Sequence, residues 1–158
     1  MAPRYGTRTP FQLLLGLVLT TTVCSKCHLS GMWKNDLGST MSIGSVNSRG
    51  GFKGSYLTAV SSTNNTITES LLAGAQELDD EPIVGFIVKW NFSKSVTVFT
   101  GQCFKDDNGS DVLETMWLLR SYTEKRKDNW KATSWCTDVL ECYLSPELQS
   151  RFVNFDEE

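Results

Sequence analysis

The sequence predicts an all-β fold, an eight-stranded antiparallel up-and-down β-barrel. Short stretches of alternating apolar and polar residues recur at roughly ten-residue intervals, and no long stretch has the helical period of about 3.6 residues. Turn-forming residues separate these stretches, and most of the breaks are short enough to be hairpins. A barrel closes its own sheet edges, and eight strands enclose room for one small ligand.

Residues 1–25 are predicted to be a secretory signal peptide that is not part of the fold. Arg4 and Arg8 precede a short apolar run, and small residues follow it. Because this run is too short to span a bilayer, we expect a secreted, extracellular protein. The barrel domain is then expected over residues 26–143, and a polar acidic tail over residues 144–158.

The first three strands carry the first candidate ligand residues. Residues 31–35 and 39–46 flank the turn sequence Asn-Asp-Leu-Gly and are predicted to form a hairpin, with Asn35 and Ser39 at its turn. Taken alone, such residues cap their own backbone, whereas in a barrel mouth they would present hydrogen-bond donors to a small ligand. A third strand is expected over residues 51–58.

The later strands carry apolar side chains on both faces. These strands are predicted over residues 65–72, 83–91, 95–104, 111–121 and 130–142. Within the last three, one face mixes aromatic and small polar residues, while the other carries Met116, Leu118 and Trp135. A monomer would expose this second face, which predicts a homo-oligomer with Met116 and Trp135 at subunit interfaces.

The five cysteines allow a disulfide in a secreted chain. Cys24 is expected to leave with the signal or lie at its edge. Cys136 and Cys142 fall in one predicted strand, with Cα atoms roughly 20 Å apart at about 3.3 Å per residue, which is too far for a bond. Cys27 and Cys103 are the best intrachain pair, tying the first strand to a central one, although the sequence leaves the connectivity open.

Three Asn-x-Ser/Thr sequences are candidate glycosylation sites, at Asn64, Asn91 and Asn108. Asn108 is the best acceptor because residues 106–109 form a turn signal. Asn91 is the least favourable because it lies between two aromatic residues.

Composition excludes several functional classes. The chain has 15 basic and 18 acidic residues, and loss of Arg4 and Arg8 with the signal changes the net charge from −3 to −5. No basic stripe remains, which argues against nucleic acid and anionic membranes as partners. The single histidine, His28, lies near the N-terminus, so a nucleophilic catalytic site is not expected, and neither is a metal site. We expect a protein that is not an enzyme.

Aromatic residues recur next to hydroxyl-bearing ones along the later strands, at Trp90, Phe92, Phe99, Trp117 and Trp130. Any one of them is explained by core packing. Together with Tyr56 and Thr58 on one face of the third strand, however, they describe a wall of rings with polar groups directed inward. That pattern is typical of a site for a small, rigid ligand with polar ends.

Five ordered stretches resemble the avidin family, over residues 31–39, 43–50, 89–104, 112–121 and 128–133. The similarity runs from about Cys27 to about Leu140. It implies a homotetramer of avidin-like barrels, each binding one biotin as a ligand and not as a catalytic cofactor.

The resemblance also implies roles for individual residues. Asn35, Ser39 and Tyr56 would donate to the ureido oxygen of biotin, and Thr58 and Asp138 would accept from its NH groups. The carboxylate of biotin would be held by the side chains of Ser61, Thr63, Ser93 and Ser95 and by the backbone of Ser62. Its sulfur would face Thr97. The apolar walls of the site would be formed by Leu37, Val60, Trp90, Phe92, Phe99, Trp117 and Leu119. Trp130 would reach the neighbouring subunit's site.

The sequence departs from the family pattern at several positions. Asp138 replaces an amide, although the streptavidin branch has an acid there. Ser61 and Ser62 replace a Thr-Ala pair, so contacts to the carboxylate could differ. Cys136 and Cys142 are additions, and Cys142 suggests an intersubunit disulfide, with buried thiols as an equal alternative.

Two alternatives stay open on sequence alone. The first alternative is a lipocalin-like carrier of another small ligand, because residues 31–33 match the Gly-x-Trp motif that opens the first lipocalin strand. A structural or egg protein without a ligand is the other, and it requires the polar residues named above to be incidental.

Overall fold

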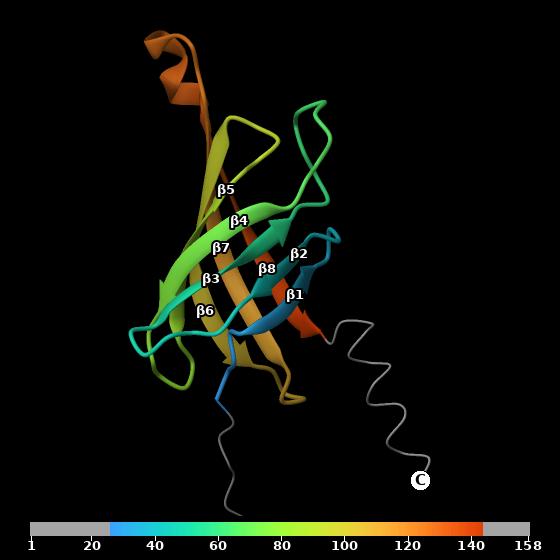
Figure 1. The fold of residues 1–158 in the computed structure, drawn as a ribbon, viewed down its shortest axis with the longest axis vertical. Helices are drawn as coiled ribbons and strands as arrows, with labels where there is room; N and C mark the ends of the chain where they lie inside the picture. Colours follow the sequence, from blue (N-terminus) through green and yellow to red (C-terminus); the bar gives the residue numbers. More distant parts are fainter. Residues whose placement is uncertain (1–25, 144–158) are drawn as a thin grey trace, which may run out of the picture.

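The computed structural model describes residues 26–143, which form one closed antiparallel barrel (Figure 1). Its strands are β1 (Gly31–Asn35), β2 (Thr40–Ile43), β3 (Gly51–Leu57), β4 (Ser70–Gln76), β5 (Ile83–Lys89), β6 (Ser95–Lys105), β7 (Asp111–Ser121) and β8 (Thr133–Tyr143). Each strand pairs with the next in the sequence, and β1 pairs with β8. The predicted fold is confirmed, while the predicted signal peptide and acidic tail lie outside the described residues.

The fourth strand differs from its predicted position. It was expected over residues 65–72, but β4 begins at Ser70, continues through Gly74 to Gln76, and pairs with both β3 and β5. Glycine is normally weak in a strand. Here a Cβ at position 74 would collide with the Gly85 carbonyl oxygen and would lie 2.5 Å from the Phe86 Cβ and 2.7 Å from the Phe52 ring, so the absence of a side chain makes room for the β5 backbone and the Phe52 ring.

The ends of two other strands also shift. β2 ends at Ile43 instead of residue 46, and β8 begins at Thr133 instead of residue 130. The residues before β8 form a 3₁₀ helix, η1 (Arg126–Lys131), in which Trp130 lies. Consequently the β3–β4 connection (residues 58–69) and the β7–β8 connection (residues 122–132) are the two longest connections between consecutive strands at one end of the barrel.

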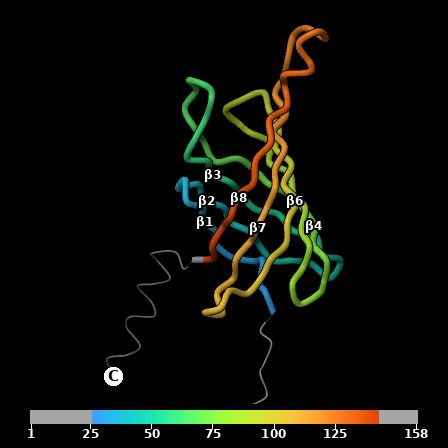
Figure 2. The backbone as a smooth tube through the Cα atoms, turned by 180° about the vertical axis from the view of Figure 1, so that it is seen from behind, coloured from blue at the N-terminus to red at the C-terminus, as the bar shows by residue number. Residues whose placement is uncertain are grey.

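Successive connections alternate between the two ends of an up-and-down barrel. The β1–β2, β3–β4, β5–β6 and β7–β8 connections therefore lie at one end, which we call the open end, and the other three lie at the closed end. Figure 2 shows the β7–β8 hairpin extending beyond its neighbours at the open end, with η1 at its tip.

Large side chains fill the barrel at its closed end. Trp33, Leu113 and Leu140 are fully buried there, and the indole nitrogen of Trp33 donates to the Leu29 carbonyl at 2.9 Å. Each fully buried apolar side chain of this size stabilises the fold by about 1.5–3 kcal/mol. This packing leaves only the open end available to a ligand.

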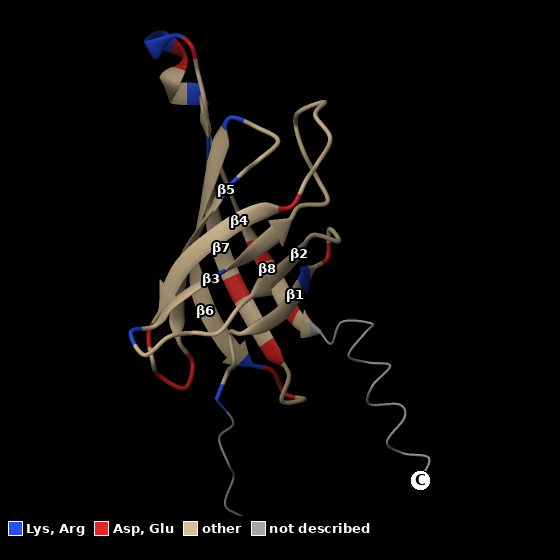
Figure 3. Ribbon diagram, in the orientation of Figure 1, with Lys and Arg blue, Asp and Glu red and all other residues tan. Residues whose placement is uncertain are grey.

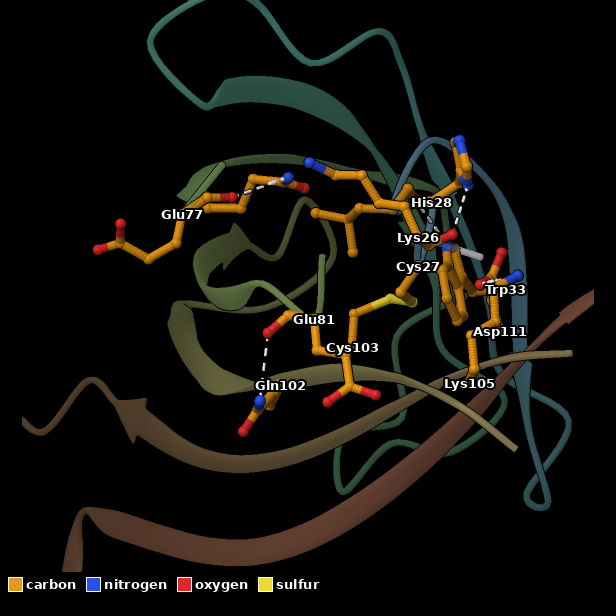
Figure 4. Close-up of a disulfide and its surroundings, with 12 residues drawn as sticks. Lys26, Cys27, His28, Trp33, Glu77, Glu81, Gln102, Cys103, Lys105 and Asp111 are labelled. Atoms are coloured by element: carbon orange, nitrogen blue, oxygen red, sulfur yellow. Dashed lines mark hydrogen bonds and ion pairs between the residues drawn. A yellow bond between two sulfur atoms is a disulfide. The ribbon is translucent and has the colours of Figure 1, made fainter. Parts of the chain in front are cut away.

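A disulfide joins Cys27 to Cys103 at the closed end (Figure 4), as the best intrachain pairing predicted. Their Cα atoms are 5.9 Å apart, and both side chains are buried. The Cys27 amide also donates to the Asp80 carbonyl at 2.9 Å, and the Cys103 amide to the Pro82 carbonyl at 3.0 Å. The segment before β1 is thereby fastened to β6 and to the β4–β5 connection. Within the described chain, Cys136 and Cys142 are free.

The outer face of the barrel carries a continuous apolar row. Registered pairs align Ile87 with Val98, Val98 with Leu118, and Leu118 with Trp135. All four are exposed in the single chain, Trp135 to 69%. The exposed second face expected from the sequence is therefore present. No helix in residues 26–143 has the length and apolarity needed to cross a membrane.

Candidate functional site

A cavity of about 570 Å³ lies at the open end of the barrel. Every predicted ligand residue lines it except Trp130. These residues are Asn35, Leu37, Ser39, Tyr56, Thr58, Val60, Ser61, Ser62, Thr63, Trp90, Phe92, Ser93, Ser95, Thr97, Phe99, Trp117, Leu119 and Asp138. Side chains separated by as much as a hundred positions thus meet in one enclosure.

The inner part of the cavity begins with the β1–β2 turn. Gly38 has a φ of 86°, a conformation that costs glycine little, and its amide donates to the Asn35 carbonyl at 2.9 Å. The Asn35 side chain then accepts from the Ser39 amide at 2.8 Å and donates to a carboxylate oxygen of Asp138 at 2.8 Å. An amide nitrogen carries two hydrogens, so one donor of Asn35 remains for a ligand.

Ser39 and Tyr56 add two more hydroxyl donors beside Asn35. Ser39 is 2% exposed, and its oxygen accepts from the Ala59 amide at 3.0 Å, which leaves its hydroxyl hydrogen to donate to Tyr56 or to a ligand. Burial is the main cause that raises the pKa of the Tyr56 phenol, and the negative charge of Asp138 raises it further. A hydrogen bond with Ser39 acts in the opposite direction and lowers this pKa. Tyr56 therefore stays protonated at neutral pH.

Asp138 is the charged group of the cavity. Burial raises the pKa of its carboxyl, while the hydrogen bonds from Asn35 and from the Val139 backbone oppose that rise. When ionised, the carboxylate can only accept hydrogen bonds. Donors from Asn35, Ser39 and Tyr56 and an acceptor from Asp138 are consequently adjacent in a partly buried site, where such groups act more strongly than in bulk water.

Aromatic rings form the walls and hold one another in place. The Tyr56 ring meets Trp90 edge-on with centroids 5.5 Å apart and Phe99 at 5.6 Å, and Trp90 meets Phe92 at 5.7 Å. The Trp90 indole nitrogen also donates to the Thr97 hydroxyl at 2.8 Å. These contacts fix the ring positions before any ligand enters, so little conformational entropy is lost on binding.

Hydroxyl groups gather at the cavity mouth in two pairs. The oxygens of Ser93 and Ser95 are 2.5 Å apart on the β5–β6 hairpin, and those of Ser61 and Thr63 are 3.1 Å apart in residues 58–69. The Asn65 side chain donates to the Phe92 carbonyl at 2.7 Å and links the two segments. The mouth can therefore donate several hydrogen bonds to an anionic or polar tail.

Three cavity residues were missed by the sequence analysis: Lys94, Ser121 and Tyr122. Ser121 continues the inward alternation that ends at Leu119, so extending the pattern by one step would have found it. Lys94 lies between two predicted serines, but its long side chain gave no periodic signal. Trp130, in contrast, is 82% exposed and does not line this chain's own cavity.

The three candidate glycosylation sites differ in their surroundings. Asn64 and Asn108 are exposed in connections, and Asn108 follows Asp106, whose carboxylate accepts from its amide at 2.9 Å. The side-chain nitrogen of Asn91 instead donates to the Glu69 carbonyl at 2.8 Å. Attachment of a glycan at Asn91 would break that bond, so Asn64 and Asn108 remain the better predictions.

These features define a class of protein, a β-barrel that binds one small molecule with a polar head and a polar tail. Donors surround one point at the inner end, rings enclose the middle, and hydroxyls ring the mouth. Among residues 26–143, no group of three His, Cys, Asp or Glu side chains could hold a metal ion.

The sequence comparisons agree with that class. The model of the Avidin family matches residues 23–142, and the chain belongs to this family. It is 56% identical over 126 residues to avidin from Gallus gallus, covering 77% of this chain and 83% of that protein. It is 52% identical over 132 residues to avidin-related protein 4/5 from Gallus gallus, covering 80% and 88%.

Solved structures of the family show the same fold. The crystal structure of Xenavidin matches with a TM-score of 0.74 and 49% identity, covering 75% of this chain and all of that one. A biotin binding protein from chicken matches with a TM-score of 0.73 and 48% identity, covering 75% and 98%.

Proposed function

We propose that this protein binds biotin tightly and without chemical conversion. The observation that carries the proposal is the group formed by Asn35, Ser39, Tyr56 and Asp138 at the inner end of an aromatic cavity. A solved relative is described as a biotin binding protein, and the chain belongs to the avidin family, which favours this function over a lipocalin-like carrier or a protein without a ligand.

The cavity chemistry suits the two ends of biotin. Its ureido oxygen would accept from Asn35, Ser39 and Tyr56, and its NH groups would donate to Asp138 and Thr58. The Thr58 hydroxyl already donates to the Val60 carbonyl at 2.9 Å and accepts from the Val60 amide at 3.3 Å, which leaves one lone pair of its oxygen as an acceptor. Thr97 would face the sulfur, and the carboxylate would lie at the hydroxyl pairs of the mouth. Several donors on one oxygen favour a polarised ureido group and strong bonds.

The finer parts of the proposal are secretion and a homotetramer. The Cys27–Cys103 disulfide supports an oxidising, extracellular location. The exposed apolar row on β5–β8 supports burial against other subunits, with Met116 and Trp135 at the interfaces. In such an assembly Trp130, exposed on η1, would complete the cavity of a neighbouring subunit.

Titration with biotin tests the central claim. We expect calorimetry to give one biotin per chain, together with quenched tryptophan emission, because Trp90 and Trp117 line the cavity. A long-chain fatty acid, a typical lipocalin-type ligand, serves as the control and should give neither signal. The proposal fails if stoichiometric biotin produces no heat and leaves the emission unchanged.

Binding is expected to weaken in acid through Asp138. Donation from the ureido NH favours the ionised carboxylate, so affinity should fall as the pH drops through the raised pKa of Asp138, which lies above the ordinary value of 3.8. The stability of the ligand-free fold should depend on pH in the opposite direction. The contribution of Asp138 to folding stability is fully present below its ordinary pKa and is lost as the pH rises through the raised pKa of the folded protein.

Calorimetry over a pH series on the wild type and Asp138→Asn measures this effect. The Asn variant cannot ionise, so its affinity should vary less with pH. Equal pH slopes for the two proteins would exclude Asp138 as the titrating group.

Cys142 is expected to form a disulfide between subunits. Cys142 is half-buried near the end of β8, where it packs against the edge of the core, and Cys136 is exposed. Non-reducing gels should show a linked dimer that Cys142→Ser abolishes and the control Cys136→Ser keeps. A monomer band for all three proteins would mean that both thiols stay reduced.

A further inference from the structure

A second hollow adjoins the mouth of the cavity. This hollow, of about 690 Å³, lies between the β5–β6 hairpin and the connection from β7 through η1. It shares six residues with the ligand cavity: Trp90, Ser93, Lys94, Ser95, Ser121 and Tyr122. A ligand tail leaving the cavity past the mouth hydroxyls would therefore enter this hollow, which we call the basic groove.

The charge of the basic groove is of one sign. Lys89, Lys94, Arg120 and Arg126 line it, and no aspartate or glutamate does. This is the reverse of the whole chain, which carries a net charge of −3. Figure 3 shows blue segments on the β5–β6 hairpin and on η1 at the same end of the barrel.

These cations are not neutralised within the described chain. The ion pairs in residues 26–143 are Lys105 with Asp111 and Lys131 with Asp128, and neither includes a groove residue. The Arg120 guanidinium bonds to neutral groups instead: the Asn129 carbonyl and the Thr133 hydroxyl, both at 3.1 Å, and the Asn129 side chain. Its charge is therefore available to a ligand.

The two sides of the basic groove are held together. The Lys94 ammonium lies 5.2 Å from the centre of the Tyr122 ring, and the Tyr122 amide donates to the Lys94 carbonyl at 2.9 Å. The hairpin and the end of β7 thus form a preset frame, which lowers the entropic cost of recognising a charged group.

We propose that the basic groove binds an anionic group, a phosphate or a carboxylate, joined through the tail carboxyl to biotin held in the cavity. The proposal rests on the proposed function and defines which derivatives of biotin are preferred. Lysine and arginine attract both anions, and phosphate, with its larger charge, more strongly. A few such exposed charge contacts correspond to an overall preference of about five- to tenfold.

Three biotin amides with the same short linker test this. They end in a phosphate monoester, a carboxylate and a neutral hydroxyl, and the release of each labelled amide from the full-length protein is timed in excess unlabelled biotin. We expect release about five- to tenfold slower for the phosphate than for the hydroxyl, with the carboxylate between them. Added salt should shrink the difference.

Charge-reversal variants locate the effect. Lys89→Glu with Arg126→Glu should remove the preference for phosphate and leave the release of plain biotin unchanged. Lys53→Glu with Lys127→Glu makes the same change in net charge at exposed positions outside the groove and should keep the preference.

The outcomes separate the two proposals. Equal release of the phosphate and hydroxyl amides, with plain biotin still retained, overturns the groove proposal and leaves biotin binding intact. Loss of the preference in both double variants also overturns it, because the effect would then come from net charge. Failure to retain plain biotin overturns both.

Discussion

Replacing Asn35 with alanine is expected to lower the affinity for biotin by about 100- to 1,000-fold, or about 3–4 kcal/mol. The variant would lose a donor to the ureido oxygen. It would also remove the acceptor of the Ser39 amide and the donor to Asp138, both at 2.8 Å. The carboxylate of Asp138 would then be left without that partner in a partly buried site, which is costly in itself.

Calorimetric competition with a weaker biotin analogue can measure a loss of this size. Lys34→Ala, an exposed neighbour on β1, is the control and should bind normally. Asn35→Asp keeps the shape but places a second carboxyl beside Asp138, so its affinity should recover partly as the pH falls. An affinity within threefold of wild type for Asn35→Ala would contradict the proposed arrangement of the ureido group.

Replacing Trp130 with lysine is expected to speed the release of biotin by at least about 30-fold and to weaken the tetramer. In the single chain this indole is 82% exposed on η1 and touches no part of its own cavity. If it covers the ligand of a neighbouring subunit, it is a buried aromatic anchor, and truncation of such residues costs about 2 kcal/mol or more.

Trp135→Lys is the matched comparison, because Trp135 is 69% exposed on the outer face of β8 and away from the cavity. It should weaken assembly, measured by sedimentation, with the contacts to biotin intact. Trp130→Lys should alter both sedimentation and release. A normal tetramer with normal release for Trp130→Lys would contradict the role across subunits.

The sequence predicted the barrel well because its signals were local. Hairpin turns and two-residue alternation identified β6 and β7 almost to the residue and put Thr97, Phe99 and Trp117 on the inward face. The fold was predicted wrongly where tertiary contacts override propensity. Gly74 lies beyond the strand predicted over residues 65–72, yet it is part of β4, where the β5 backbone and the Phe52 ring leave no space for a side chain.

The candidate site was predictable in part for a similar reason. Asn35 and Asp138 meet only because β1 closes against β8, a contact between the two ends of the barrel that no local pattern encodes. Their pairing was accessible through the resemblance to a family. Lys94 and Tyr122 were missed because they belong to the connections, where neither alternation nor that resemblance identified a role.

The position of the disulfide has a consequence for how this protein can vary. The covalent link and the filled core occupy one end of the barrel, and the ligand cavity, the basic groove and η1 occupy the other. Substitutions in the open-end connections can therefore retune recognition with little effect on folding. The barrel is in this sense a scaffold whose selectivity can evolve, or be engineered, separately from its stability.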